Sequence, residues 1–284
     1  MEWVFLNGRF VERGEAAAPA LDRGLLYGYG LFETMRSYGG RVFRLEEHYR
    51  RLCEGAAVLD LPPPAFALDD LRVAIDALLR ENGLGDAYLR LTVTAGPAPD
   101  DGGASPSVLL VARPLSGYPP DLYQRGMAAV TSASRRNEAS SLSRVKSLNY
   151  LDNLLAREEA RRKGADEAIL LNTRGLVAEG SASNVFLIGS EGLLTPSIES
   201  GALPGITRAA VLELAPAAGL PCAECDVEAT TLAGAAEAFL TNSIMGVMPL
   251  TRLDGQPIGS GRPGPVTGAI RRLYARTVAR ETAR

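Results

Sequence analysis

The chain has 284 residues, of which 46% are hydrophobic and 22% charged, and its 30 basic and 33 acidic residues leave a formal net charge of -3. This composition is that of a globular protein with room for one large domain or two smaller ones, and it excludes the basic surface typical of nucleic-acid-binding proteins. No apolar run reaches the roughly 18 residues of a membrane-spanning helix, and the N-terminus lacks the apolar segment of a signal peptide. We therefore expect a cytoplasmic protein that binds neither nucleic acid nor membranes.

The apolar residues in the first 115 positions follow strand-like and helix-like patterns. In chain order, they predict a hairpin around an Asn-Gly turn at 3–11, a strand at 40–45, amphipathic helices at 45–59 and 68–82, and strands at 87–96 and 107–115. We expect these elements to form a small α/β domain, residues 1–115, followed by a proline-rich linker at 116–121.

The rest of the chain predicts a larger domain, residues 122–284, with more strands than helices. Strands are predicted at 126–133, 167–172, 175–179, 184–189, 192–196, 237–243 and 245–253, and helices at 149–163, 205–219 and 266–281. In the first of these helices, Tyr150, Leu151, Leu154 and Leu155 are expected to face the core. The sequence as a whole therefore predicts an α+β protein of two domains.

Several residues with reactive side chains are expected to have no catalytic or metal-binding role. The single histidine, His48, is expected on the surface of its helix or half-buried there, because an isolated titratable group is rarely catalytic. Cys222 and Cys225 form one C-x-x-C pair, which supplies too few ligands for a metal site, so free thiols are expected. Ser143 and Lys146 match the S-x-x-K signature of acyl-transferring hydrolases, but the K-T-G motif of that chemistry is missing. We therefore expect neither a metal centre nor a serine hydrolase.

Lys146 is unusual because the chain otherwise prefers arginine. Of 30 basic residues only Lys146 and Lys163 are lysines, which leaves 28 arginines. An arginine side chain keeps its proton at any working pH, whereas a desolvated lysine amine loses its proton more readily and then attacks a carbonyl group or removes a proton. The sequence therefore indicates amine chemistry at Lys146.

Other stretches supply what pyridoxal phosphate needs besides a lysine, namely an acid against its ring nitrogen and an anion site for its phosphate. Glu179 ends a predicted apolar strand before a turn of small residues, where its carboxylate would keep the pyridine nitrogen protonated. The helix after Gly205 offers the backbone N–H groups of Ile206 and Thr207 to an anion. Further anion donors are expected at Asn242, Ser243 and Arg51.

In this order, the motifs resemble the fold-type IV (class IV) pyridoxal-phosphate family, which contains branched-chain aminotransferases, D-amino-acid aminotransferases and 4-amino-4-deoxychorismate lyases. The resemblance extends over nearly the whole chain. DRGLLYGYGLFETMR and HYRRL are similar to the small N-terminal domain, and RVKSLNYLDNLLAREEA, VAEGSASNVFLI, TPSIESGALPGITR and FLTNSIMGVMPLT to the larger, β-rich cofactor domain. The resemblance implies the two-domain, D-amino-acid aminotransferase-like fold and a homodimer whose site is completed across the subunit interface.

The resemblance also implies roles for particular residues. Lys146 would be the Schiff-base lysine and the catalytic acid/base, and Glu179 would pair with the pyridine nitrogen. The phosphate would be held by Arg51, Ile206, Thr207 and Ser243, with Asn242 adjacent. A small amino-acid-like substrate would face Tyr29, Phe32, Tyr88 and Arg90, of which Arg90 is the candidate clamp for a carboxylate.

Within the family, the sequence favours an aminodeoxychorismate lyase, which converts 4-amino-4-deoxychorismate to 4-aminobenzoate and pyruvate in folate biosynthesis. LYGYGLFETMR, TPSIESGALPGITR and LTNSIMGVMPLT look most similar to such lyases. SLNYLDN lacks the extra glycine that branched-chain enzymes carry after the lysine, and YLRLTVTAG lacks the second arginine and the histidine of D-amino-acid enzymes.

Two alternatives stay open. VAEGSASNVF is also close to the D-amino-acid type, so the chain is alternatively a class IV aminotransferase, which transfers an amino group from a branched-chain or D-amino acid to a 2-oxo acid. The other alternative is a non-catalytic homologue that binds the cofactor without turning over an amine.

Overall fold

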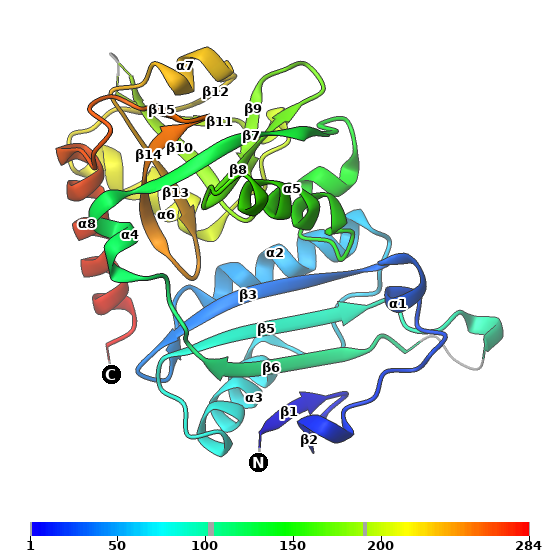
Figure 1. The fold of residues 1–284 in the computed structure, drawn as a ribbon. Coiled ribbons are helices and arrows are strands. Elements are labelled where there is room, and N and C mark those ends of the chain that lie inside the picture. The colour runs from blue at the N-terminus through cyan, green and yellow to red at the C-terminus, as the bar shows by residue number, and fades with distance from the viewer. Residues whose placement is uncertain (1, 102–104, 190–191, 284) are drawn as a thin grey trace. The chain divides into compact units, whose positions relative to one another are not determined.

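The structure, a computed structural model, describes residues 2–101, 105–189 and 192–283. It separates into two compact units, each built around a β-sheet (Figure 1). The first unit comprises Met1–Ser116, Val145–Asn149 and Ala279–Arg284, and the second comprises Gly117–Arg144 and Tyr150–Val278. The mixed α and β content that the sequence predicts is confirmed.

In the part of the chain that the structure describes, six antiparallel strands form the sheet of the first unit, in the order β2-β1-β6-β5-β3-β4. Their bounds are β1 Trp3–Leu6, β2 Arg9–Glu12, β3 Gly30–Tyr38, β4 Arg41–Val42, β5 Ala87–Thr94 and β6 Val108–Pro114. Helices α2 (Leu45–Val58) and α3 (Leu68–Glu81) pack against one face of this sheet, and a short helix, α1 (Arg23–Tyr27), precedes β3 (Figure 1). Leucines of the sheet and of both helices, including Leu31, Leu52 and Leu78, form the apolar core between them.

The hairpin at the start of the chain has the predicted Asn-Gly turn. Asn7 and Gly8, between β1 and β2, have φ angles of 50° and 84°. Positive φ at both central residues is the type I′ geometry that matches the twist of two antiparallel strands. This local prediction is confirmed because the turn chemistry resides in two adjacent residues.

The second unit contains a mixed sheet. Over the described residues it has nine strands, eight of them in the order β12-β11-β10-β13-β14-β7-β8-β9, with β15 paired to β14. The strand bounds are β7 Met127–Arg136, β8 Glu167–Asn172, β9 Val177–Gly180, β10 Asn184–Gly189, β11 Gly192–Pro196, β12 Cys222–Cys225, β13 Glu237–Asn242, β14 Gly246–Leu253 and β15 Gln256–Pro257. The helix bounds are α4 Pro120–Arg125, α5 Leu151–Arg162, α6 Ile206–Ala217, α7 Ala229–Ala233 and α8 Pro265–Glu281. None of the helices in the described residues is long and apolar enough to span a membrane.

The division of the chain differs from the one expected from sequence in one respect that concerns Lys146. We expected residues 122–284 to form one domain, but Val145–Asn149 belongs to the first unit. The reason is backbone pairing with β3: Phe32 N donates to Lys146 O at 2.9 Å, and Leu148 N donates to Gly30 O at 2.9 Å. The C-terminal residues from Ala279 onward also join the first unit, and the expected linker at 116–121 runs into α4.

The orientation of α5 also differs from the expectation. Leu151, Leu154 and Leu155 were expected to face the core, but they are 66%, 52% and 53% exposed. The buried face of α5 carries Asn153, Ala156 and Ala160 instead, and this face packs against β7 and β8. Small side chains allow the helix to approach the sheet closely, so the leucine stripe is left outside, and apolar periodicity alone gave the wrong face.

Candidate functional site

Lys146 is held on the edge of the first unit's sheet, beside an aromatic ring. The backbone bonds to β3 fix the position of the half-buried lysine, and its Nζ lies 4.4 Å from the centroid of the Phe32 ring. The guanidinium carbon of Arg90 lies 3.9 Å from the centroid of the same ring. The structure therefore brings together three of the residues predicted for the site: Lys146, Phe32 and Arg90.

Tyr88 and Tyr29 lie differently with respect to this group. Tyr88 is two residues from Arg90 in β5, and the alternation of side chains along a strand puts both on the same face of the sheet. Tyr29 packs instead against the apolar core, and its hydroxyl donates to the carbonyl of Leu59 at 2.6 Å. Tyr88 thus shares a sheet face with Arg90, while the Tyr29 hydroxyl has another partner.

A buried charged network behind β3 was not predicted from sequence. Glu33 accepts from Arg51 Nε at 2.8 Å and from Arg51 Nη2 at 2.5 Å, and His48 Nδ1 lies 2.7 Å from the same carboxylate. His48 is 2% exposed, so the expectation of a surface or half-buried histidine is wrong. Its helix position predicted a surface residue, whereas the distant strand residue Glu33 provides the partner that makes burial tolerable.

The charges of this network follow from burial and pairing. Burial by itself would raise the pKa of Glu33, but the charge of Arg51 and the contact with His48 outweigh it and lower the pKa to about 2. Burial lowers the pKa of His48, although Glu33 opposes the shift. Near neutral pH, Glu33 is therefore ionised and the imidazole of His48 is uncharged.

In the second unit, Glu179 is a buried carboxylate near the end of β9. The residue is 5% exposed, one carboxylate oxygen lies 3.2 Å from Arg136 Nη2, and the other accepts from the backbone N of Leu203 at 2.8 Å. Asn184 Nδ2 is a weaker donor to the same oxygen, at 3.4 Å. Arg136 lies outside the quoted motifs, and Asn184, although it lies within VAEGSASNVFLI, was not singled out as a site residue. Both contacts with Glu179 arise only in the folded protein.

The start of helix α6 lies close to this carboxylate. Its N-cap is Gly205, and no side chain caps the helix there, so the N–H groups of the first turn, including those of Ile206 and Thr207, have no partner within the helix. A Cβ atom at Gly205 would clash with Oδ1 of Asn184, the side chain that also contacts Glu179. Glycine therefore fits where the helix begins, and the helix N-terminus is brought next to the carboxylate.

The turn after β13 completes this region. Asn184 in β10 is the register partner of Thr241 in β13, so the residues that follow, Asn242 and Ser243, lie near the Glu179 cluster. Asn242 donates from Nδ2 to Ala182 O at 3.0 Å, and its Oδ1 accepts from two backbone N–H groups of the turn. The amide of Asn242 thus shapes the turn, and direct contact of Asn242 with a phosphate stays a prediction.

The donor set of the second unit fits pyridoxal phosphate. A buried carboxylate suits the ring nitrogen, and an uncapped helix N-terminus suits the phosphate. The Thr241 hydroxyl is buried, and within the described residues it has no hydrogen-bond partner. A polar ligand would satisfy such a group.

A loop of small residues between β9 and β10 holds Glu179 in place. Glu167 accepts hydrogen bonds from the hydroxyls of Ser181 and Ser183, and Tyr150 donates from its hydroxyl to the Ser181 carbonyl at 2.8 Å. Burial, with a smaller contribution from Glu179, raises the pKa of Tyr150, so its hydroxyl stays protonated. Glu167 and Tyr150 were not predicted as site residues, since they act through the loop.

Ser143 and the two cysteines of the C-x-x-C pair are placed by the second unit's backbone. Ser143 donates to Asn137 O at 2.6 Å, which engages the hydroxyl that the S-x-x-K interpretation requires. Cys222 and Cys225 lie three residues apart in β12, so their side chains point to opposite faces of the strand and do not form a thiol pair. Over the described residues, no group of His, Cys, Asp and Glu side chains is arranged to hold a metal ion.

Comparison with known proteins finds relatives over nearly the whole chain. The family model described as amino-transferase class IV matches residues 30–253. The chain is 36% identical over 285 residues to a D-alanine aminotransferase of Bacillus licheniformis, covering 99% of each chain. It is similar to the crystal structure of the Escherichia coli branched-chain amino acid aminotransferase, with 31% identity, a TM-score of 0.92, and coverage of 99% of this chain and 96% of that one.

A third similarity bears on the cofactor. The branched-chain amino acid aminotransferase of Thermobaculum terrenum, solved in its PLP-form, matches with a TM-score of 0.87 and 31% identity over 99% of this chain and 94% of that one. The fold that the chain shares with these structures is that of pyridoxal-phosphate enzymes of the class IV aminotransferase type. The chain belongs to the amino-transferase class IV family, and its cofactor is pyridoxal phosphate.

These relatives also correct the preferred member of the family. The sequence favoured an aminodeoxychorismate lyase, but the relatives described above are aminotransferases. The aminotransferase alternative is therefore better supported, and neither a lyase activity nor a role in folate biosynthesis has support from them. The short motifs misled because they report the shared cofactor chemistry, whereas the outcome of the reaction depends on the substrate side of the site.

Proposed function

We propose that the protein transfers an amino group between an amino acid and a 2-oxo acid, with a branched-chain or D-amino acid as one substrate. The observation that carries this proposal is the placement of Lys146 beside Phe32 and Arg90, which puts a reactive amine, an apolar ring and a fixed cation together. Relatives of nearly the same length act on branched-chain amino acids or D-alanine. The same interpretation assigns the protein to the cytoplasm, where its cysteines stay reduced.

Each residue has a separate task in this proposal. When bound, pyridoxal phosphate supplies an aldehyde and an electron-withdrawing ring. Lys146 would hold the cofactor through its aldehyde, and its released Nζ would accept the proton of the substrate α-carbon and return a proton, as the catalytic acid/base. Glu179 holds the proton on the ring nitrogen. The phosphate is bound by Arg51, Ile206, Thr207 and Ser243, with Asn242 shaping the turn.

The assay that tests this function pairs an amino donor with an oxo acid acceptor. Purified protein with pyridoxal phosphate is given L-leucine, L-glutamate or D-alanine together with pyruvate or 2-oxoglutarate, and the new amino acid is identified by chiral chromatography. Formation of a new amino acid that depends on both partners supports the proposal. Release of pyruvate from 4-amino-4-deoxychorismate without any oxo acid, and no exchange with these pairs, would establish a lyase instead.

Arg90 is proposed to bind a carboxylate of the substrate, and Phe32 and Tyr88 to form the apolar wall beside it. Arg90→Met keeps an unbranched side chain against Phe32 but removes the charge. We expect the KM for the oxo acid to rise about 10- to 100-fold, the range of a lost hydrogen bond to a charged group, with a smaller change in kcat. The comparison is Arg72→Met, which removes a surface arginine paired with Glu46. Equal kinetic constants for both variants would exclude this role.

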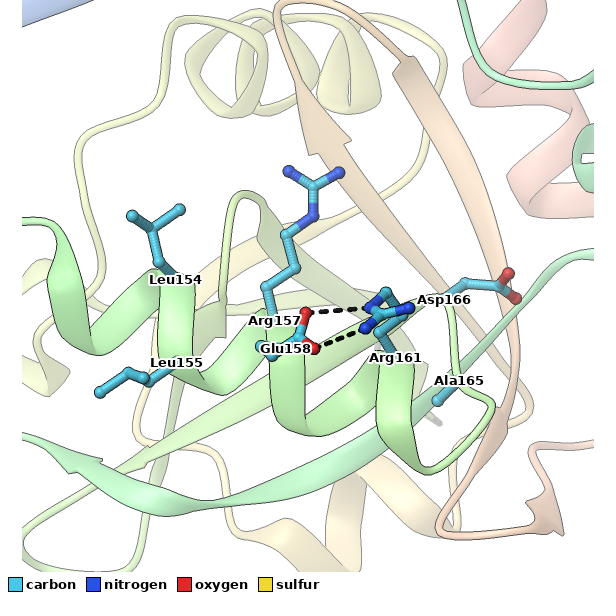
Figure 2. A pocket seen from close by; sticks show the side chains of 7 residues that line it. All are labelled: Leu154, Leu155, Arg157, Glu158, Arg161, Ala165 and Asp166. Atoms are coloured by element: carbon cyan, nitrogen blue, oxygen red, sulfur yellow. Dashed lines mark hydrogen bonds and ion pairs between the residues drawn. The ribbon is translucent and has the colours of Figure 1, made fainter.

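The protein is also proposed to form a homodimer, because neighbouring apolar side chains are exposed together on α1 and on α5. Leu25, Leu26 and Tyr27 of α1 are 69%, 49% and 71% exposed. On α5, Leu154 and Leu155 border a surface hollow whose other lining residues are charged or small, as Figure 2 shows. Contiguous exposed apolar side chains rimmed by charged residues are typical of protein interfaces.

Replacing both Leu154 and Leu155 with glutamate tests whether α5 belongs to the dimer interface. Burying one leucine contributes about 1.5–3 kcal/mol, so the pair of substitutions is expected to weaken the dimer more than about 100-fold. Light scattering after gel filtration measures this as a shift from dimer to monomer mass. Val73→Glu is the control, because Val73 is 68% exposed on α3. A double variant that stays dimeric at micromolar concentration would place the interface elsewhere.

A further inference from the structure

Glu33 is a buried carboxylate in a strand whose neighbouring residues on the same face are apolar. It is 1% exposed, and the residues two positions away on either side, Leu31 and Met35, belong to the apolar core. A carboxylate in such surroundings is unfavourable unless its charge is paired and its oxygens accept hydrogen bonds. His48 and Arg51, three residues apart on α2, provide both.

The hydrogen bonds between Glu33 and Arg51 fix the orientation of the guanidinium group. Nε of Arg51 donates to one oxygen of Glu33 at 2.8 Å and Nη2 donates to the other at 2.5 Å. Two donors on one edge of the planar guanidinium group meet the two carboxylate oxygens, which restrains the plane of the group as well as its position. His48 Nδ1, at 2.7 Å, restrains the carboxylate in turn. Arg51 therefore takes an orientation that Glu33 sets.

Stability alone is a weak reason for this network. Replacing a buried ion pair with apolar residues of similar volume is often neutral or stabilising, and apolar residues here would extend the core that surrounds Glu33. The location of the network suggests another reason. The pKa of His48 is lowered mainly by burial, and also by the charges of Arg51 and Lys146. Glu33 directly follows Phe32 in β3, and Phe32 N donates to Lys146 O at 2.9 Å, so the network lies beside the segment that carries the lysine.

We propose that Glu33 is the positioning residue of the phosphate-binding arginine. It holds Arg51 in one orientation and balances its charge before any phosphate is bound, so the cofactor meets a preformed anion site. The inference rests on the proposed function, in which Arg51 binds the phosphate ester. Preorganisation of this kind strengthens binding because the arginine has no freedom left to lose when the ligand arrives.

The test compares two ligands that differ only in the phosphate. Dissociation constants for pyridoxal phosphate and for pyridoxal are measured with the wild-type protein and with Glu33→Gln, by titration calorimetry on protein stripped of cofactor. We expect the affinity for pyridoxal phosphate to fall about 10- to 100-fold, the effect known for residues that orient ligating side chains in metal sites. The affinity for pyridoxal should stay unchanged. Equal losses for both ligands, or no loss for either, would overturn the proposal.

Two further variants assign the effect to Arg51. In an Arg51→Gln background, Glu33→Gln is expected to have no additional effect on the binding of pyridoxal phosphate; full additivity of the two losses contradicts the proposal. Glu46→Gln makes the same chemical change at an exposed glutamate of α2 that pairs with Arg72, and should leave both affinities as they are.

Loss of folding in Glu33→Gln, detected by circular dichroism, does not end the test. His48→Asn removes the imidazole that restrains Glu33 and leaves the pair with Arg51 intact. This variant should lose a smaller part of its affinity for pyridoxal phosphate and keep its affinity for pyridoxal. An equal loss of affinity for both ligands counts against the proposal. If the wild-type protein bound pyridoxal phosphate no better than pyridoxal, the proposed phosphate site itself would be wrong. This result differs from one that contradicts only the positioning role of Glu33.

Discussion

Lys146→Arg is expected to abolish covalent attachment of the cofactor and to lower kcat/KM for transamination by roughly 10⁴-fold or more. Arginine keeps a positive charge on the Phe32 ring, but it stays protonated at every working pH. The guanidinium group therefore neither bonds to the cofactor aldehyde nor moves a proton. Loss of the yellow colour of the holoenzyme and the steady-state rate measure the two effects.

The chain supplies a matched control for this substitution. Lys163, its other lysine, lies at the end of α5, and its Nζ is 2.7 Å from Glu159 on the surface. Lys163→Arg makes the same chemical change and should leave colour and rate unaltered. A Lys146→Arg protein that retained wild-type activity would show that another group carries the reaction.

Glu179→Gln is expected to lower kcat/KM by on the order of 10²–10³-fold, the magnitude for loss of a preorganised electrostatic contact at a reacting group. Glutamine keeps the size of the side chain and can still accept from Leu203 N, so the fold should persist. It lacks the negative charge that pairs with Arg136 and that we propose holds a proton on the ring nitrogen. The kinetics are measured with saturating cofactor, so that weaker cofactor binding is excluded as the cause.

Glu179→Asp separates the charge from the geometry in this prediction. Aspartate keeps the charge on a shorter side chain, so it should recover part of the activity that Glu179→Gln loses. Glu228→Gln changes an exposed glutamate of the same unit and serves as the control. Activity within threefold of wild type in Glu179→Gln would mean that the ring nitrogen does not depend on this carboxylate.

Much of the fold could be predicted because its signals are local. The Asn-Gly turn, the amphipathic helix α3 and the apolar run of β8 each carry their pattern within a few adjacent residues. The lysine and Glu179 could be singled out for a similar reason, since residue type and strand position suffice to suggest their chemistry. Substitutions of Lys146 and Glu179 test the roles assigned to them.

Other parts of the site could not be predicted, because they depend on residues far apart in the sequence. The partner of His48 is 15 positions away in another element, so only the folded sheet reveals that the histidine is buried. In the same way, Arg136 at the end of β7 and Glu179 in β9 become neighbours only in the folded protein. The prediction that the leucines of α5 face the core was wrong for a different reason. Periodicity identifies an apolar stripe but does not say whether a sheet or another surface covers it.

The sequence by itself indicated amine chemistry at Lys146, because this lysine persists in a chain that is otherwise rich in arginine. Motifs of adjacent residues determined the class of cofactor chemistry. The tertiary structure decided the surroundings of that amine. Backbone pairing with β3 moves Val145–Asn149 into the first unit and sets Lys146 against Phe32, and the packing of β3 against α2 buries Glu33, His48 and Arg51 behind it. The physical reason is that residue type fixes which reactions a side chain can perform, whereas burial and charge pairing arise only between segments that folding brings together.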